Sequence, residues 1–177
     1  MGISQGGSER ALPGVTGWRS MTAADLDRVA EIAVVGFPDH FEGRPCFANR
    51  LALNPAGCFV LQTADGLEGY LVAYPWARDA APTLNTLIEA IPAEADVMYL
   101  HDLALTPAVR GQGWSKPAVA AVVDLAKAGG RATIALVAVN DAVDFWRGHG
   151  FEVRRTPEMA AKLASYGPDA RYMTRTV

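Results

Sequence analysis

An arginine and two glycines stand directly before a predicted helix in the segment TPAVRGQGWSKPAVAAVVDLA, from Thr106 to Ala126. A helix start carries unpaired N–H groups and the positive end of the peptide dipoles, so it attracts phosphate where the backbone can be approached closely. Gly111 and Gly113 remove two Cβ atoms that would obstruct this approach, and Arg110 adds a permanent cation. The turn is therefore predicted to bind a phosphate or pyrophosphate, although two glycines can also simply make a tight turn.

The familiar nucleotide-binding loops do not fit this turn. A dinucleotide-binding fingerprint needs a third glycine, whereas the sequence from Gly111 reads G-Q-G-W-S-K. A P-loop needs G-K-[ST] after a longer loop. Any anion site here belongs to another type.

The turn lies between a predicted strand and a predicted helix. The segment 97–105 reads as a strand, 112–127 as a helix ended by two glycines, and 132–139 as an apolar strand buried on both faces. A strand, a helix and a strand within about 40 residues indicate a crossover between parallel neighbours. Elsewhere the patterns predict strands at 18–21, 58–63, 67–74 and 151–155, an edge strand at 171–177, and helices at 26–37, 44–51, 84–91 and 141–147, the last capped by Asn140.

Length and charge limit the classes of function. The 177 residues suffice for one domain, predicted at 18–177 after a disordered extension at 1–17 rich in Gly, Ser and Pro. Sixteen Lys and Arg against 19 Asp and Glu give a net charge of −3 without runs of like charge. Such a chain has no long-range field to gather nucleic acid or anionic lipid, so neither is expected as a partner.

Cysteine and histidine usage points to a protein without disulfide or metal framework. Cys46 and Cys58 are the only cysteines, and we expect both to be buried thiols. The chain shows no apolar run approaching ~18 residues and no leader-like N-terminus, which favours the cytoplasm. The three histidines and two cysteines lack a paired ligand spacing, so no metal site is predicted.

The segment from Met98 to Val153 resembles the GNAT superfamily of acyl-CoA-dependent N-acyltransferases. The family signature [RQ]-x-x-G-x-[GA] is similar to Arg110 through Ser115, with serine in place of Gly or Ala, and NDAVDFWRGHGF from Asn140 is similar to the family's downstream pattern. The resemblance implies an α/β (α+β) fold, with a mixed, largely antiparallel sheet of about six to seven strands. It also implies a parallel, splayed central pair and helices on both faces.

The resemblance also implies acetyl-CoA as the acyl donor. The pyrophosphate is expected at the turn and the pantetheine along the splayed strand, where a backbone N–H would polarise the thioester carbonyl. Phe145 is expected to pack in the core, whereas Trp146 is expected to be more open. The residues implied to bind the cofactor are Leu103, Ala104, Leu105, Arg110, Gly111, Gln112, Gly113, Trp114, Ser115, Asn140, Phe145 and Trp146.

The candidate residues for proton transfer lie on the strand 97–105. His101 titrates near neutrality and occupies a place where some relatives carry a catalytic histidine, so it is the candidate base, with a structural histidine as the alternative. Tyr99 shares its face at period two and could relay a proton, whereas Asp102 is expected on the opposite face. Many relatives have a tyrosine acid where Trp146 stands, so the general acid is unassigned. His149 is expected in a surface turn.

The leading prediction is an N-acetyltransferase that moves an acetyl group from acetyl-CoA to a primary amine by direct attack in a ternary complex. A catalytically weak acyl-CoA sensor and a structural protein with an incidental turn are the alternatives. The acceptor is expected between the segments 37–50 and 76–96, where Phe41, Glu42, Trp76 and Asp79 favour a cationic amine. The dense apolar strands are also compatible with a homodimer.

Overall fold

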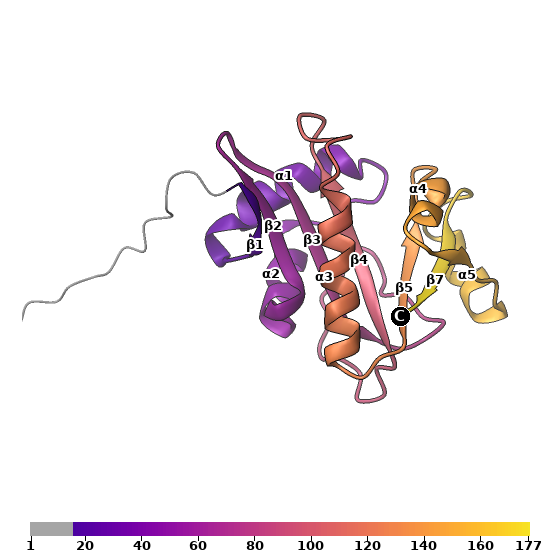
Figure 1. Cartoon of the computed structure of the whole chain (residues 1–177). Helices are drawn as coiled ribbons and strands as arrows, with labels where there is room; N and C mark the ends of the chain where they lie inside the picture. Colours follow the sequence, from indigo (N-terminus) through magenta and orange to yellow (C-terminus); the bar gives the residue numbers. More distant parts are fainter. Residues whose placement is uncertain (1–15) are drawn as a thin grey trace, which may run out of the picture.

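A seven-stranded mixed sheet forms the centre of the computed structural model, which describes residues 16–177 (Figure 1). The extension predicted at 1–17 lies outside the described residues as far as position 15, and Gly17 already belongs to the first strand. The domain boundary itself stays a prediction. The strands are β1 Gly17–Ser20, β2 Cys58–Thr63, β3 Gly66–Trp76, β4 Val97–Leu105, β5 Thr133–Ala138, β6 Glu152–Val153 and β7 Arg171–Thr176.

Among residues 16–177, five α-helices and two short 3₁₀ helices connect the strands. Before α1, the backbone N–H of Thr22 donates to the carboxylate of Asp25 at 2.8 Å, the arrangement of a capping box. Within residues 16–177, none of the helices is both long enough and apolar enough to cross a membrane. The helices are η1 Ala23–Asp25, α1 Leu26–Gly36, α2 Arg44–Leu53, η2 Pro55–Gly57, α3 Ser115–Ala128, α4 Val143–Gly148 and α5 Pro157–Ala164.

The order of the strands in the sheet is β1-β2-β3-β4-β5-β7-β6. All neighbouring pairs are antiparallel except β4 and β5, which are parallel and joined through α3. The fold prediction is thus confirmed. The placement of 171–177 at an edge was wrong, because β7 inserts between β5 and β6 and pairs with both. The two-residue β6 is the edge instead, since a strand so short leaves few backbone groups unpaired.

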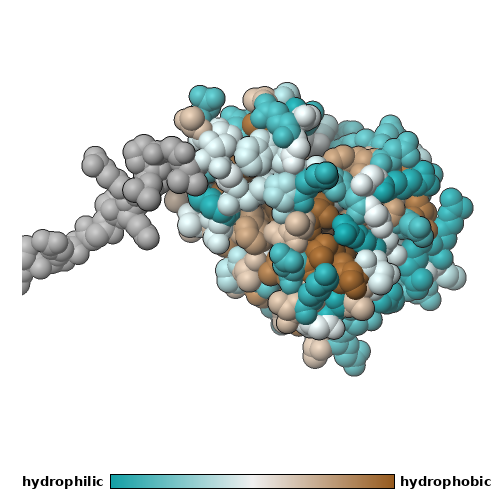
Figure 2. Space-filling model, viewed as in Figure 1, coloured by the Kyte–Doolittle hydropathy of each residue, from teal (hydrophilic) through white to brown (hydrophobic). Residues whose placement is uncertain are grey.

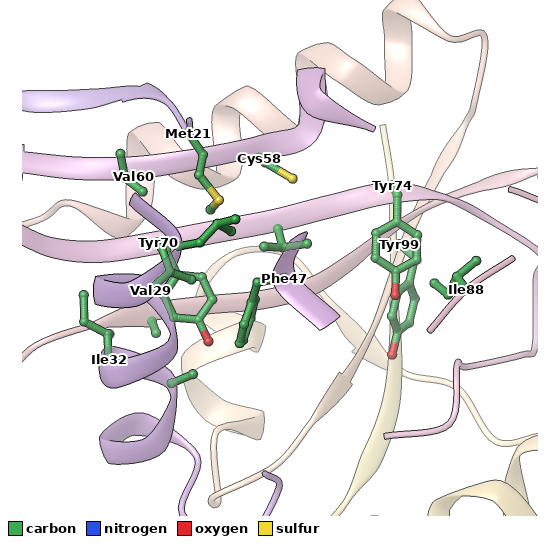
Figure 3. Close-up of a cluster of buried hydrophobic side chains, with 14 of the residues drawn as sticks. Met21, Val29, Ile32, Phe47, Cys58, Val60, Tyr70, Tyr74, Ile88 and Tyr99 are labelled. Carbon is green, nitrogen blue, oxygen red and sulfur yellow. The ribbon is translucent and has the colours of Figure 1, made fainter. Parts of the chain in front are cut away.

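The sheet buries one apolar cluster on each face. On one face, α1, α2 and α5 contribute to a cluster that includes Tyr70, whose ring meets Phe47 of α2 edge-on with 5.4 Å between centroids (Figure 3). On the other face, α3 and α4 cover residues that include Leu100 and Leu136. Both cysteines are buried and free, as expected. In the view of Figure 2, hydrophobic surface residues gather near the middle of the drawn face among hydrophilic ones.

The helix predicted at 84–91 is wrong. Asn85 has φ +52°, which an α-helix does not allow, and Asn49 of α2 binds both backbone groups of Ile88. These two hydrogen bonds, each 2.9 Å, hold the segment against α2 as irregular chain. The apolar spacing of the segment therefore reflects single residues that reach the core, such as Ile88, and not a helix face.

Three smaller differences concern element ends. β3 continues to Trp76 through Pro75 and pairs with β4 there, two residues beyond the predicted end. The segment after β6, where the sequence patterns predict no helix or strand, contains α5, which starts with Thr156 accepting a hydrogen bond from the N–H of Met159 and with Pro157 in the first turn. α3 begins at Ser115, three residues later than predicted, because both turn glycines adopt positive φ.

Candidate functional site

The turn before α3 leaves open space above its backbone. Gly111 and Gly113 have φ +76° and +86°, a region that L side chains rarely adopt, and a Cβ added at either would meet no atom within 4 Å. The glycines are therefore required by the backbone conformation of the turn, and the space in front of this backbone is open to a ligand. Trp18 of β1 donates from its indole N–H to the carbonyl of Trp114 at 2.9 Å, which ties the turn to the sheet.

Two long side chains of the turn bind the backbone next to it. Arg110 Nε donates to the carbonyl of Leu105 at 2.9 Å, so its exposed guanidinium is held beside the end of β4. Gln112 donates from its amide to the carbonyl of Ala108 at 3.0 Å and does not line the cleft. The cation is thus placed where the sequence predicts it, whereas Gln112 stabilises the loop.

A cleft of about 550 Å³ lies between the end of β4 and the turn. Most residues implied as cofactor-binding line it, and Gly36 and Phe37 at the end of α1 are additional. Sequence patterns could not indicate these two, because they come from the far end of another helix. The lining residues are Gly36, Phe37, Leu103, Ala104, Leu105, Arg110, Gly111, Gly113, Trp114, Ser115 and Phe145.

The parallel strands β4 and β5 diverge beside this cleft (Figure 1). They pair only at Met98 with Ile134 and at Tyr99 with Ala135. From Leu100 to Leu105, β4 pairs only with β3. A second hollow, of about 130 Å³, lies between the diverging strands and adjoins the 550 Å³ cleft. Leu103 and Trp146 are among the residues that line it. The predicted splayed pair is therefore present.

The two aromatic residues of α4 take the reverse of their predicted positions. Phe145 is 46% exposed and lines the cleft, whereas Trp146 is 7% exposed and packs edge-on against Phe151 with 5.4 Å between centroids. α4 starts at Val143, two residues later than predicted. The face of α4 that carries Trp146 therefore packs against the apolar cluster on β5, and the prediction was wrong. Phe145 is thus the aromatic side chain available to a ligand.

Asn140 does not cap α4, contrary to the prediction. Ala142 occupies the cap position, and Asn140 has φ +56°. Its amide donates to the carbonyl of Gly36 at 3.1 Å. Asn140 therefore links the end of β5 to the end of α1 at the rim of the second hollow.

A hydrogen-bonded network lies on the α1 face of β4, around His101. The His101 ring places Nε2 2.5 Å from Oε1 of Glu42 and Nδ1 2.9 Å from the hydroxyl of Tyr74. Asp102 accepts a hydrogen bond of 2.8 Å from the hydroxyl of Tyr70. The side chains of His101 and Glu42 are 6% and 5% exposed.

Asp102 shares this face with His101, so the prediction of opposite faces was wrong. Val72 of β3 pairs with Asp102 and the next residue, Ala73, pairs with Leu100, which leaves His101 as an extra residue in β4. A bulge of this kind breaks the alternation of side chains along a strand. Tyr99, predicted to share the face of His101, does so, with 6.1 Å between the ring centroids.

Burial and mutual contact shift the pKa values of the network. Burial lowers the pKa of His101, but the carboxylates of Glu42 and Asp102 outweigh it, so the pKa is raised. Burial raises the pKa of Glu42, but His101 reverses this, so it is lowered. Burial raises the pKa of Asp102 to about 6 despite His101. The network therefore contains a carboxyl group that titrates close to neutrality.

Ligand-type atoms of Glu42, His101 and Asp102 lie within 4.8 Å of one another. The expectation of no metal site rested on local spacing, which cannot detect a group assembled from β4 and a distant loop. Both ring nitrogens of His101 already have partners in Glu42 and Tyr74. The geometry is therefore that of a hydrogen-bonded proton network.

A hollow of about 40 Å³ adjoins the network on its solvent side. Of the residues predicted to favour a cationic acceptor, only Glu42 lines it. Asp79 instead binds Arg154 at 2.7 Å, and Phe41 is 57% exposed. Tyr166, which the sequence did not indicate, lines the hollow and donates its hydroxyl to the carbonyl of Pro82 at 2.5 Å. The lining residues are Phe37, His40, Glu42, Leu84, Tyr99, His101, Asp102, Val137, Val139 and Tyr166.

The comparison with protein families identifies the class of this chain. Residues 25–151 match the model of the acetyltransferase (GNAT) family, and the chain belongs to that family, whose members use acyl-CoA. Comparison with curated proteins gave no match.

Solved structures with this fold differ in what they do. Ard1 from Thermoplasma volcanium is 17% identical, with 94% of this chain and 99% of that one covered and a TM-score of 0.70. Arabidopsis thaliana Naa50, in complex with the bisubstrate analogue CoA-Ac-MVNAL, is 15% identical, with 92% and 99% covered and a TM-score of 0.66. The GNAT-like decarboxylase GphF, in complex with isobutyryl-CoA, is 18% identical, with 90% and 98% covered and a TM-score of 0.71. At these identities the similarity shows the fold alone.

Proposed function

We propose that this protein transfers an acetyl group from acetyl-CoA to a primary amine by direct attack within a ternary complex. The observation that carries the proposal is that two sites meet at the splayed end of β4. The open cleft faces the turn at Gly111 and Gly113, and the hollow beside His101 and Asp102 lies across the same strand. A donor and an acceptor can thus approach β4 from different sides.

The donor side fits acyl-CoA. Gly111 and Gly113 adopt positive φ and place no Cβ atom in the path of the diphosphate, and Arg110 stands next to it. Bound acetyl-CoA would supply a thioester, which is open to attack by an amine. The unpaired side of β4 between Leu103 and Leu105 supports the proposal that backbone N–H groups there stabilise the developing negative charge.

The acceptor side fits the head of a cationic amine. Its volume, about 40 Å³, exceeds the ~10–15 Å³ that a group the size of one water molecule requires. Alkylamines with a pKa near ~10.4 arrive as ammonium ions, and the carboxylates of Glu42 and Asp102 attract them. The ammonium must lose a proton before its nitrogen can attack.

Asp102 is the proposed proton acceptor, and His101 is its charged neighbour. His101 has both nitrogens engaged by Glu42 and Tyr74, which supports a role in holding the charge of the network. Asp102 has a pKa of about 6, near the operating pH that favours a general base. We therefore place the first proton transfer at Asp102, with His101 as its electrostatic partner. Burial raises the pKa of Tyr99 well above its usual value, so Tyr99 serves as a neutral neighbour.

The alternative is an acyl-CoA sensor without efficient turnover. It is favoured by Trp146, which is buried and offers no acidic hydroxyl where many relatives carry tyrosine. For the transferase and for the sensor alike, the two free cysteines support the proposal that the protein works in the reducing cytoplasm.

Two measurements separate these functions. Thermal unfolding with and without CoA tests cofactor binding, because a ligand of the native state raises the melting temperature. Thiol release from acetyl-CoA is then followed with polyamines, amino acids, aminoglycosides and peptide N-termini. Stabilisation together with thiol release supports the transferase, and stabilisation alone supports the sensor. A melting temperature that CoA does not change overturns both.

A further inference from the structure

Ser115, the first residue of α3, contacts a histidine from a different element. Its Oγ lies 3.2 Å from Nε2 of His149, which directly follows α4. Ser115 lines the 550 Å³ cleft together with Gly113 and Arg110. His149 was expected in a surface turn, yet it is half-buried and its ring faces the start of α3.

The ring of His149 is fixed from several sides. Phe145 packs against it edge-on with 4.9 Å between centroids, and Trp146 lies 6.1 Å away. The backbone carbonyl of His149 accepts a hydrogen bond of 2.8 Å from Arg175 of β7, and its N–H donates to the carbonyl of Trp146 at 2.9 Å. A ring held in this way can orient the hydroxyl it contacts.

We propose that His149 is a positioning residue that turns the hydroxyl of Ser115 toward a phosphate oxygen of bound acyl-CoA. Nε2–H of His149 donates to Ser115 Oγ, which leaves the serine hydrogen free to donate to the phosphate. The inference rests on the proposed function, because it needs the diphosphate at the turn. It gives the serine, which stands where the family signature has Gly or Ala, a binding role.

The charges around His149 give this contact a pH dependence. Burial, Arg175 on β7 and Lys116 on α3 lower the pKa of His149, while Asp144 on α4 is paired with Arg147 at 3.1 Å. The ring is therefore neutral at neutral pH and donates from Nε2 as one tautomer. A proton added to His149 places positive charge next to the diphosphate, so CoA affinity should rise as the pH falls through the pKa of this histidine.

The test is a double-mutant cycle on CoA affinity, measured by calorimetry with the full chain. Ser115→Ala and His149→Ala should each weaken binding about two- to tenfold, the equivalent of one hydrogen bond. The double variant should be no weaker than the worse single variant, because both remove the same contact. Losses that multiply, or variants that bind as tightly as the wild type, would overturn the proposal.

His149→Gln is the conservative control, since its side-chain amide can donate from the Nε2 position but does not titrate. This variant should bind CoA at pH 8 as tightly as the wild type does. Between pH 8 and pH 5 its CoA affinity should rise less than that of the wild type. The 3′-phosphate of CoA titrates near pH ~6 itself, so the difference between wild type and this variant is the readout. Equal pH profiles in the two proteins would contradict the role of His149.

Pantetheine, which lacks the diphosphate, locates the contact. Ser115→Ala should bind pantetheine as the wild type does, and a loss equal to that for CoA would place the hydroxyl elsewhere and overturn the proposal. A wild-type protein that binds no CoA would instead refute the proposed function. The melting temperature of each variant tests whether it is folded. If His149→Ala is unfolded, Ser115→Ala and His149→Gln are sufficient to test the proposal.

Discussion

Nε2 of His101 lies 2.5 Å from Oε1 of Glu42, although the two residues are 59 positions apart in the chain. Glu42 comes from the loop between α1 and α2, and the N–H of Asn85 donates to its other oxygen at 3.2 Å. The ion pair therefore joins β4 to two loops beside the 40 Å³ hollow. Breaking it should affect both the stability of the fold and the shape of this hollow.

The stability of the protein should depend on pH through this pair. The lowered pKa of Glu42 stabilises the fold above its unfolded value near 4.5, and this is lost as the pH falls through the folded pKa. The raised pKa of His101 stabilises the fold below its unfolded value near 6.5, and this is lost as the pH rises through the folded pKa. The contribution of the pair should thus be largest between pH 4.5 and 6.5, as melting curves across pH can show.

Glu42→Gln should remove most of this contribution and lower the free energy of unfolding by about 1–3 kcal/mol at pH 6, because a buried histidine loses its charged partner. Denaturant unfolding measures the change. Glu89→Gln, an exposed residue, is the matched control and should stay within about 0.5 kcal/mol of the wild type. Equal losses in both variants would contradict the buried pair.

Asp102→Asn should lower kcat by about 10²- to 10⁴-fold, the usual contribution of a positioned base, and leave CoA affinity unchanged. In the wild type, kcat should fall as the pH drops below about 6, because a protonated Asp102 cannot accept a proton. Steady-state rates across pH, with an amine found by thiol release, give both results. A variant with the wild-type rate and pH profile would exclude Asp102 as the base.

Gly113→Ala should weaken CoA binding by about tenfold. The alanine is strained at φ +86° by about 1–2 kcal/mol, and its Cβ points into the cleft. Gly148→Ala is a suitable control, because it stands at the end of α4 without a positive φ and with no atom within 4 Å of its added Cβ. Calorimetric titration with CoA compares the two, and similar affinities would count against the anion site.

Phe145→Ala and Trp146→Ala should separate binding from folding. Phe145 is 46% exposed in the cleft, so its loss should cost about 1 kcal/mol of CoA binding and little stability. Trp146 is buried, so its loss should lower the free energy of unfolding by about 3–5 kcal/mol. Leu87→Ala, an exposed residue of the irregular segment, is the control for both. If Phe145→Ala instead lowered the stability and Trp146→Ala weakened CoA binding, Phe145 would be the buried residue and Trp146 the open one, as the sequence predicted.

The sequence predicted the turn before α3 better than the surroundings of His101. The turn at Arg110 to Ser115 is local, so its glycines and the following helix could be interpreted together, and the strands on both sides were found nearly to the residue. The bulge at His101 depends on how β3 pairs with β4, which no local pattern records. The contacts of Glu42 and Tyr166 arise from loops that fold over the sheet, so their positions could not be inferred either.

Beyond Tyr99, the side of β4 that faces β5 has no neighbouring strand to shield it. The peptide groups along this side should exchange their hydrogens with solvent quickly in the free protein. A bound cofactor lying there would slow the exchange while leaving β2 and β7 unaffected. Deuterium uptake, followed residue by residue with and without CoA, would therefore show whether a cofactor covers this side of β4.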